Sequence, residues 1–128
     1  MLPVRRLSAL LLASLVTLAA QADDPVKRIP LERAELAGTN LVAVTARVEA
    51  AAGAQLARHT HPGVEITTCV SGEMDLSVDG QPVRHIAAGD HFQVPAGVAH
   101  SIKFGNGPSV LLATFVVEKD KPMATPAP

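Results

Sequence analysis

The chain has 128 residues and a formal net charge of -1, a length that suits one domain and is too short for two cores of ordinary size. It is 48% hydrophobic and only 18% charged, which excludes a disordered polyelectrolyte. Aromatic residues make up 2% of the chain and basic residues are not in excess, so we expect no nucleic-acid partner, because such proteins offer stacking rings or a basic surface.

The first 22 residues have the pattern of a secretory signal peptide. Arg5 and Arg6 precede an apolar run from Leu7 to Ala20, and small residues at 20 and 22 suit a signal peptidase. We expect cleavage after Ala22, a periplasmic or secreted protein, and no stable membrane insertion afterwards. An uncleaved membrane anchor is the alternative, for which the apolar run is short. The general secretory route and the twin-arginine route both stay open.

Residues 23–39 predict an N-terminal arm. We expect Asp23 to Ile29 to be extended, and Leu31 to Leu36 to make at most one helical turn, since Pro30 and Gly38 confine it. At the other end, residues 119–128 (KDKPMATPAP) predict a flexible proline-rich tail that does not pack.

Residues 40–118 predict a single all-β domain. From Leu41 to Glu49, apolar and other residues alternate with the period of a strand. Glycine and proline then interrupt the chain at short intervals, and Asp79-Gly80 suits a tight hairpin turn. Short runs bounded by such residues are typical of a β-sandwich or barrel.

Two motifs in this domain carry candidate metal ligands. The first runs from Gly53 to Gly72 with the spacing G-x5-H-x-H-x3-E-x6-G. Residues two apart in a strand project from one face, so His59 and His61 can present both imidazoles to one cation. The turn at Pro62-Gly63 then allows Glu65 to bring a carboxylate to the same place.

The second motif, Gly89 to His100, has the spacing G-x5-P-x-G-x2-H and brings His100 in from another strand. Three imidazoles and one carboxylate suit a divalent transition metal and leave positions for water or substrate.

These two motifs resemble those of the cupin superfamily, in its small single-domain form. The resemblance covers roughly residues 40–117 and implies a cupin-type jelly-roll β-barrel that often forms a homodimer. It also implies that His59, His61, Glu65 and His100 are the ligands of a divalent metal (Mn, Fe, Ni, Co, Cu or Zn). The second motif often ends in Asn where this chain has Phe104, a position that holds no ligand.

Strand alternation extends the prediction to the surroundings of the metal. Thr67 and Cys69 share the face of Glu65, so we expect Cys69 to be buried. The expected pocket residues are Gln55, Thr67, Phe92, Val94 and Phe104, with Gln55 as the polar neighbour of His59. We expect His85 and His91 to be surface residues.

Such a site favours a metal-dependent, dioxygenase-like oxidoreductase acting on a small molecule, with Glu65 as the catalytic base. A metal-dependent isomerase or lyase stays open on the same ligands. A non-catalytic periplasmic module that binds or senses a small molecule is the alternative from another class. A structural zinc site is less favoured, because such sites are closed and rich in sulfur. The sheet edges and the arm are the expected dimer contacts.

Overall fold

The computed structural model describes residues 24–128, so the expected signal peptide at 1–22 lies outside the described residues. Among the residues that are described, no helix is long and apolar enough to cross a membrane.

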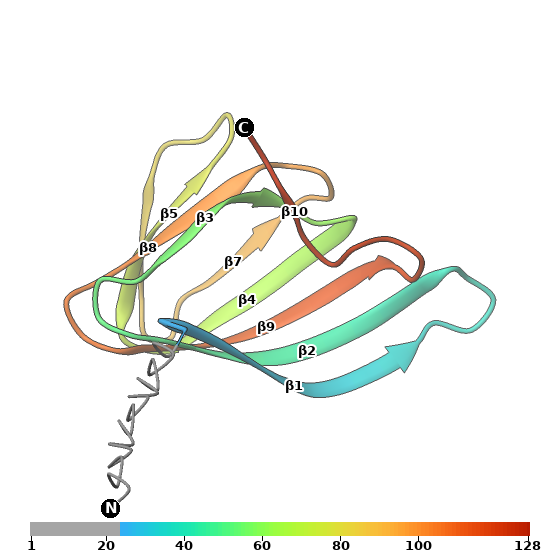
Figure 1. The fold of residues 1–128 in the computed structure, drawn as a ribbon, viewed down its shortest axis with the longest axis horizontal. Helices are drawn as coiled ribbons and strands as arrows, with labels where there is room; N and C mark the ends of the chain where they lie inside the picture. Colours follow the sequence, from blue (N-terminus) through green and yellow to red (C-terminus); the bar gives the residue numbers. More distant parts are fainter. Residues whose placement is uncertain (1–23) are drawn as a thin grey trace, which may run out of the picture.

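Antiparallel strands in two sheets make up the fold, as Figure 1 shows. The strands are β1 (Val26–Glu35), β2 (Leu41–Ala50), β3 (Gln55–Thr60), β4 (Gly63–Ser71), β5 (Glu73–Val78), β6 (Arg84–Ala87), β7 (His91–Val94), β8 (His100–Phe104), β9 (Ser109–Glu118) and β10 (Thr125–Pro126). One sheet has the order β1-β2-β9-β4-β7 and the other β10-β3-β8-β5-β6. This confirms the all-β jelly-roll prediction, in the form of two facing sheets rather than one closed barrel.

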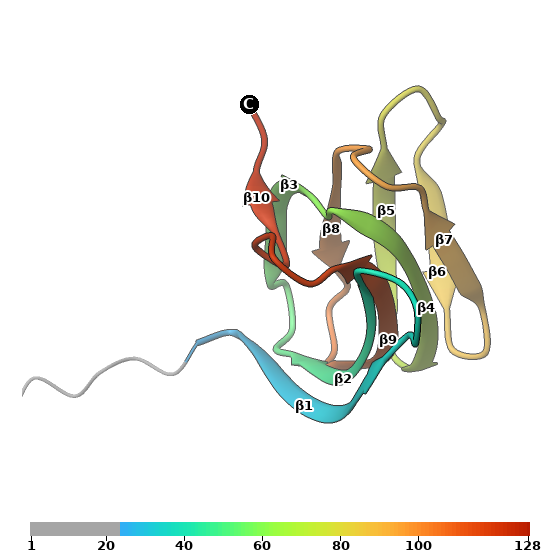
Figure 2. The ribbon, with the colours of Figure 1, turned by 90° about the vertical axis from the view of Figure 1, so that its right-hand side faces the viewer.

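The chain passes repeatedly from one sheet to the other, and this brings the two motifs together. Strands β3 and β8 are neighbours in one sheet, and β4 lies in the sheet that faces them (Figure 2). On β4, Glu65, Thr67 and Cys69 are buried, while Ile66 and Thr68, which lie between them, are exposed. Strand alternation therefore points Glu65 between the sheets, and the predicted burial of Cys69 is confirmed.

The hydrophobic core fills the space between the sheets away from the histidines. Met74 and Leu76 on β5 and Ile86 on β6 are each 1% exposed, and Phe92 and Phe104 are each 2% exposed. Packing of this kind holds the sheets at a fixed separation, so the side chains between them keep one geometry.

Two glycines allow β4 to fit where it does. A Cβ on Gly63 would collide with the backbone of Val116 on the neighbouring strand β9. Gly72, which closes the first motif, has a φ of 81°, and a Cβ there would collide with Ser109. Side chains at either position would push β4 away from β9.

The structure confirms that the N-terminal arm is extended, but the helical turn expected at Leu31 to Leu36 is wrong. Residues Val26–Glu35 form β1, which pairs along β2 with a bulge between Pro30 and Glu32. The edge of β2 offers a full row of backbone partners, which outweighs the weak local tendency to turn. Proline is tolerated here because β1 is an edge strand and carries a bulge.

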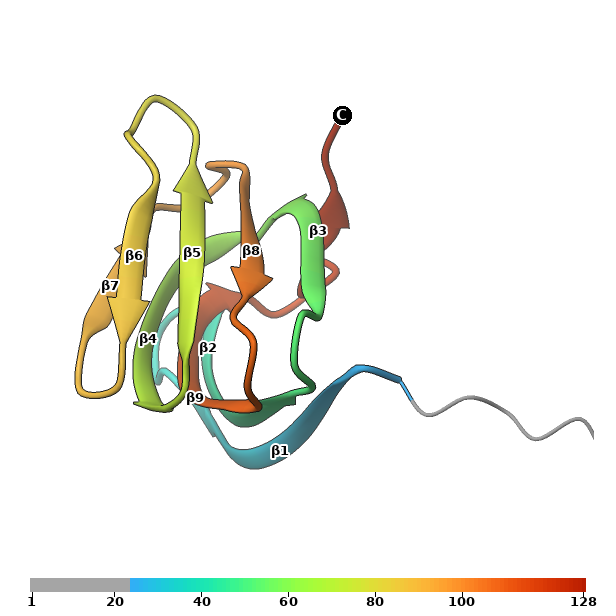
Figure 3. The same ribbon diagram turned by 90° about the vertical axis from the view of Figure 1, so that its left-hand side faces the viewer.

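The prediction that residues 119–128 do not pack is also wrong. Figure 3 shows the C-terminal segment beside β3, where β10 pairs with Thr60 and His59. The backbone N–H of Ala127 donates to the Arg58 carbonyl at 3.1 Å, and Arg58 Nε donates to the Pro128 carbonyl at 2.6 Å. Without this segment β3 would be an unpaired sheet edge, so the tail gains backbone partners by docking.

Candidate metal centre

Three imidazoles meet at one end of the space between the sheets. His59 lies on β3, His61 follows that strand directly, and His100 opens β8. His59 pairs with His100 in the sheet register. One ring nitrogen from each residue lies within 4.8 Å of the others. The structure thus brings together the three predicted histidines in a group that could hold a metal ion.

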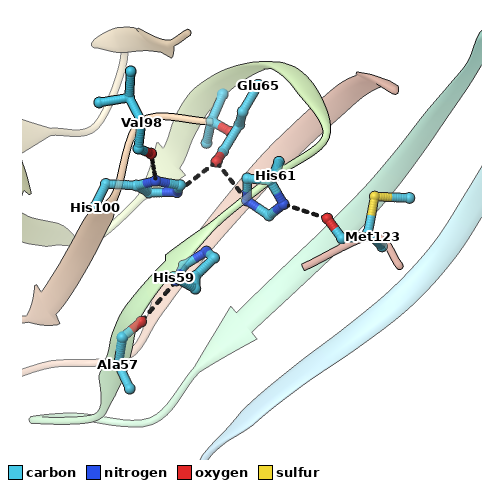
Figure 4. Close-up of polar contacts among 8 residues, drawn as sticks. Ala57, His59, His61, Glu65, Val98, His100 and Met123 are labelled. Carbon is cyan, nitrogen blue, oxygen red and sulfur yellow. Dashed lines mark hydrogen bonds and ion pairs between the residues drawn. The ribbon is translucent and has the colours of Figure 1, made fainter. Parts of the chain in front are cut away.

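Backbone carbonyls hold each of these rings in one orientation (Figure 4). His59 Nδ1 lies 2.7 Å from the Ala57 carbonyl oxygen, and His100 Nδ1 lies 3.1 Å from that of Val98. His61 Nδ1 lies 2.6 Å from the carbonyl oxygen of Met123 in the C-terminal segment. A carbonyl only accepts, so all three Nδ1 atoms carry the proton and donate. In the neutral rings, Nε2 then presents its lone pair, as in histidines that ligate metals.

Glu65 reaches the same group from the facing sheet. Its Oε2 lies 3.0 Å from His100 Nε2 and 3.2 Å from His61 Nε2, and its Oε1 accepts a hydrogen bond of 2.7 Å from Thr67 Oγ1. Burial acts to raise the pKa of Glu65, but the contacts with His100, His61 and Thr67 outweigh it and lower the pKa to about 2. The carboxylate is therefore ionised whenever the protein is folded near neutral pH.

The pKa values of His100 and His59 are shifted in opposite directions. Burial acts to lower the pKa of His100, but the hydrogen bonds to Glu65 and to the Val98 carbonyl, together with the negative charge of Glu65, outweigh it and the pKa is raised. Since Nδ1 already donates to Val98, the contact with Glu65 requires a second proton on the ring. Burial lowers the pKa of His59, and the neighbouring His100 and His61 lower it further. Without a metal, a proton on His100 neutralises the carboxylate.

The donor set fits a metal ion. His61 Nε2 is buried and makes no hydrogen bond, because in the neutral ring neither it nor the facing Glu65 Oε2 carries a proton. A buried nitrogen without a partner is costly, and a cation among the three Nε2 atoms and Glu65 would satisfy it. Three imidazoles and a carboxylate are the ligands that first-row divalent ions prefer.

Beside the histidines lies a cavity of about 580 Å³, a volume in the range of small-molecule sites. Its walls are aliphatic apart from one ring and come from β2, β3, β8 and β9. The wall residues are Val44, Ala46, Val48, Leu56, Ile102, Leu111, Ala113 and Phe115. The exposed residues that line it form its rim: Arg28, Pro30, Ala57, Arg58, Ala124 and Pro126. The cavity can hold a mostly apolar ligand against the metal group.

A family model described as "Cupin domain" matches residues 46–115, which include all four predicted ligands. The chain belongs to the cupin family. No curated protein sequence matches this cupin significantly.

Solved structures that are similar to this cupin confirm its fold. An uncharacterized conserved protein with a double-stranded β-helix domain from Klebsiella pneumoniae is 23% identical, with a TM-score of 0.63 over 85% of this chain and 90% of that one. Recombinant oxalate oxidase in complex with glycolate is 23% identical, with a TM-score of 0.64 over 82% of this chain and 56% of the oxidase chain.

The DMSP lyase DddQ from Ruegeria pomeroyi is 25% identical, with a TM-score of 0.62 over 66% of this chain and 43% of that one. The cupin therefore spans less than half the length of this lyase.

None of the five predicted pocket residues lines the cavity, and the errors have two causes. The pairing of β3 with β8 shifts register between Leu56 and His59. This bulge turns Leu56 inward with His59 and leaves Gln55 exposed. Phe92 and Val94 lie on β7, on the other side of β4 from the cavity-lining strand β9.

Two of the predicted pocket residues serve the site or the core in another way. Thr67 is fully buried behind the site and donates a hydrogen bond to Glu65. Thr67, rather than the predicted Gln55, is therefore the polar neighbour of a candidate metal ligand. Phe104, at the far end of β8 from His100, packs in the core. His85 and His91 are exposed, as predicted.

The sequence interpretation missed the contributions of both chain ends to this site. Arg28 and Pro30 lie two apart on β1 and both line the cavity, a spacing that would have indicated one strand face. No sequence signal marks Met123, because its backbone carbonyl rather than its side chain holds His61.

Proposed function

We propose that this cupin binds one divalent first-row metal ion through His59, His61, His100 and Glu65. The observation that carries the proposal is the orientation of the three rings: each Nδ1 is held by a carbonyl, and His61 Nε2 is buried without a partner. The donor set accommodates Mn, Fe, Co, Ni, Cu or Zn. The adjacent open cavity supports a ligand-binding or reactive site over a closed structural zinc site.

The activity that we propose is an oxygenase-type reaction on a small organic molecule that occupies the cavity. A bound metal supplies a positive charge and, in the case of a redox-active ion, an electron-transfer centre. The chain's own residues position the substrate along the aliphatic walls and exclude bulk water. Glu65 Oε2 is the proposed proton acceptor, and Thr67 orients it through Oε1.

A metal-dependent lyase is the second candidate. It is supported by the 25% identity with the DMSP lyase DddQ and by Glu65, the only carboxylate among the described residues that line the cavity.

We also propose, from the signal sequence, that the mature protein is periplasmic or secreted.

The test uses the mature chain from residue 23 onward, purified and analysed for metals, together with the variants His59→Ala, His100→Ala and the control His91→Ala. His91 is an exposed histidine on β7 outside the site. We expect about one metal ion per chain in the wild type and in the control, and none in the two site variants. Metal-free wild-type protein after reconstitution would refute the proposal.

Oxygen uptake with a panel of small enols, phenols and thiols then tests the reaction. Metal-dependent uptake that is lost in Glu65→Gln protein that still contains the metal supports the oxygenase and the role of Glu65 as proton acceptor. Product formation without oxygen supports the lyase. Metal binding without any turnover supports the non-catalytic binding or sensing module instead.

A further inference from the structure

The charges that line the cavity do not cancel. Besides the histidines, its charged side chains are Arg28, Arg58 and Glu65. Glu65 is held by His100, His61 and Thr67. The guanidinium of Arg58 binds the Asp79 carboxylate through both terminal nitrogens, with Arg58 Nη2 at 2.6 Å from Asp79 Oδ2. Arg58 and Glu65 are thus already neutralised by partners within the protein.

Arg28 has no such partner. Within residues 24–128 its side chain makes no hydrogen bond or ion pair, although β1 places it on the cavity. Arg28 pairs with Val48 on β2, and Val48 pairs with Leu111 on β9. All three residues line the cavity. Residues opposite one another in a sheet share a face, so the register itself directs Arg28 to the same side as these two aliphatic residues.

We infer that the natural ligand of this cavity is a small organic carboxylate with an apolar body, and that Arg28 binds its carboxylate group. A single planar guanidinium matches a carboxylate with two parallel hydrogen bonds. The body lies along Val48 and Leu111, and the end away from the carboxylate faces the histidines. The inference rests on the proposed function and specifies the ligand class of that site.

The strand supplies its own control. Lys27 is the preceding residue on β1, is exposed, and does not line the cavity, because it projects from the opposite face. Lys27→Gln therefore removes the same charge from the same strand without changing the cavity. Arg28→Gln removes the guanidinium and leaves a shorter, uncharged polar side chain.

The experiment measures binding of octanoate, octanamide and octanol by calorimetry to the metal-containing protein. We expect the wild type to prefer octanoate, Arg28→Gln to lose about tenfold or more of this affinity, and Lys27→Gln to retain it. Octanol binding is expected to be equal in all three proteins. An Arg28→Gln variant with unchanged octanoate affinity, or a wild type without preference for the carboxylate, would overturn the inference.

Octyl phosphate provides a further arm, because a phosphate is the other anion that an arginine recognises. Stronger binding of the phosphate than of octanoate would overturn the carboxylate assignment. The metal content of each sample separates this inference from the proposed function. We expect Arg28→Gln to keep its metal. A wild type that contains no metal would refute the metal site. A metal-containing Arg28→Gln variant with unchanged octanoate binding would refute only the role of Arg28.

Discussion

His100 and His59 have pKa values shifted in opposite directions, and only His100 of these two forms a hydrogen bond with Glu65. The contact of Glu65 with His100 raises the pKa of that imidazole against the effect of burial, whereas His59, which lacks a hydrogen bond to the carboxylate, has a lowered pKa. A metal must therefore displace a proton from His100. Metal affinity should fall as the pH decreases through the raised pKa of His100.

Replacement of Glu65 by Gln should lower the pKa of His100 in the metal-free protein. The substitution removes the negative charge that stabilises the imidazolium and leaves the opposing effect of burial. The measurement is an NMR titration of the histidine ring protons. His85 serves as an internal reference, since its pKa is raised by Asp75 and Glu73 on the neighbouring strand β5, at the opposite side of the sheet from β3, and should not change. An unchanged midpoint for His100 would contradict the described contact.

Replacement of Thr67 by Val should weaken metal binding by about tenfold, since partners that orient a ligand contribute on this scale. The hydroxyl that donates to Glu65 Oε1 is lost while the shape of the side chain is kept. The matched control is Thr68→Val, at the adjacent exposed position on the other face of β4. Equal metal affinity in the two variants, measured by competition with a chelator, would show that Thr67 has no part in orienting Glu65.

At the scale of elements, β10 and the segment before it hold one of the three rings. Deletion of residues 123–128 should lower metal affinity by about tenfold, because His61 loses the Met123 carbonyl that fixes its Nδ1 proton. In contrast, Met123→Ala keeps the backbone carbonyl and should keep the affinity. Chelator competition measures both variants, and circular dichroism checks that the truncated protein is folded. A folded truncated protein that binds metal as the wild type does would contradict this role.

Strand alternation predicted the inward face of β4 correctly and that of β3 incorrectly. On β4 the pattern runs without interruption from Glu65 to Cys69, so the face of one residue determines the others. On β3 a bulge after Leu56 reverses the alternation, and the bulge depends on pairing with β8, which no local signal in residues 55–60 encodes. The docking of the tail similarly depends on the free edge of β3, a property of the assembled sheet.

At the scale of the whole molecule, the all-β class was predictable because short strands bounded by glycine and proline are local patterns. The meeting of His59 and His61 with the distant His100 was predictable because the two motifs resemble those of the cupin superfamily. The cavity was less predictable. It requires the relative positions of both sheets and both chain ends, and its rim includes Arg28 and Pro126, which are far apart in the sequence.

The homodimer expected from the sequence stays a prediction, and the structure indicates where to test it. Strand β1 is the edge of its sheet, and Ile29 and Leu31 on it are 40% and 51% exposed. An apolar edge strand is a typical site of pairing with another chain. We expect a dimer by light scattering coupled to gel filtration, and a monomer for the Ile29→Lys variant. The outward-facing Val83→Lys, in the turn before β6, should stay dimeric. A wild-type monomer, or an Ile29→Lys dimer, would exclude this edge as the contact.

Since Pro128 is held beside Arg58 at the rim of the cavity, any extension added after the last residue begins close to the opening of the cavity that the histidines line. A hexahistidine tag fused there would present its imidazoles at an effective concentration on the order of millimolar and would compete with the native ligands for the same ion. Metal stoichiometry is therefore best measured on protein tagged at the other end, or on protein from which the tag has been cleaved.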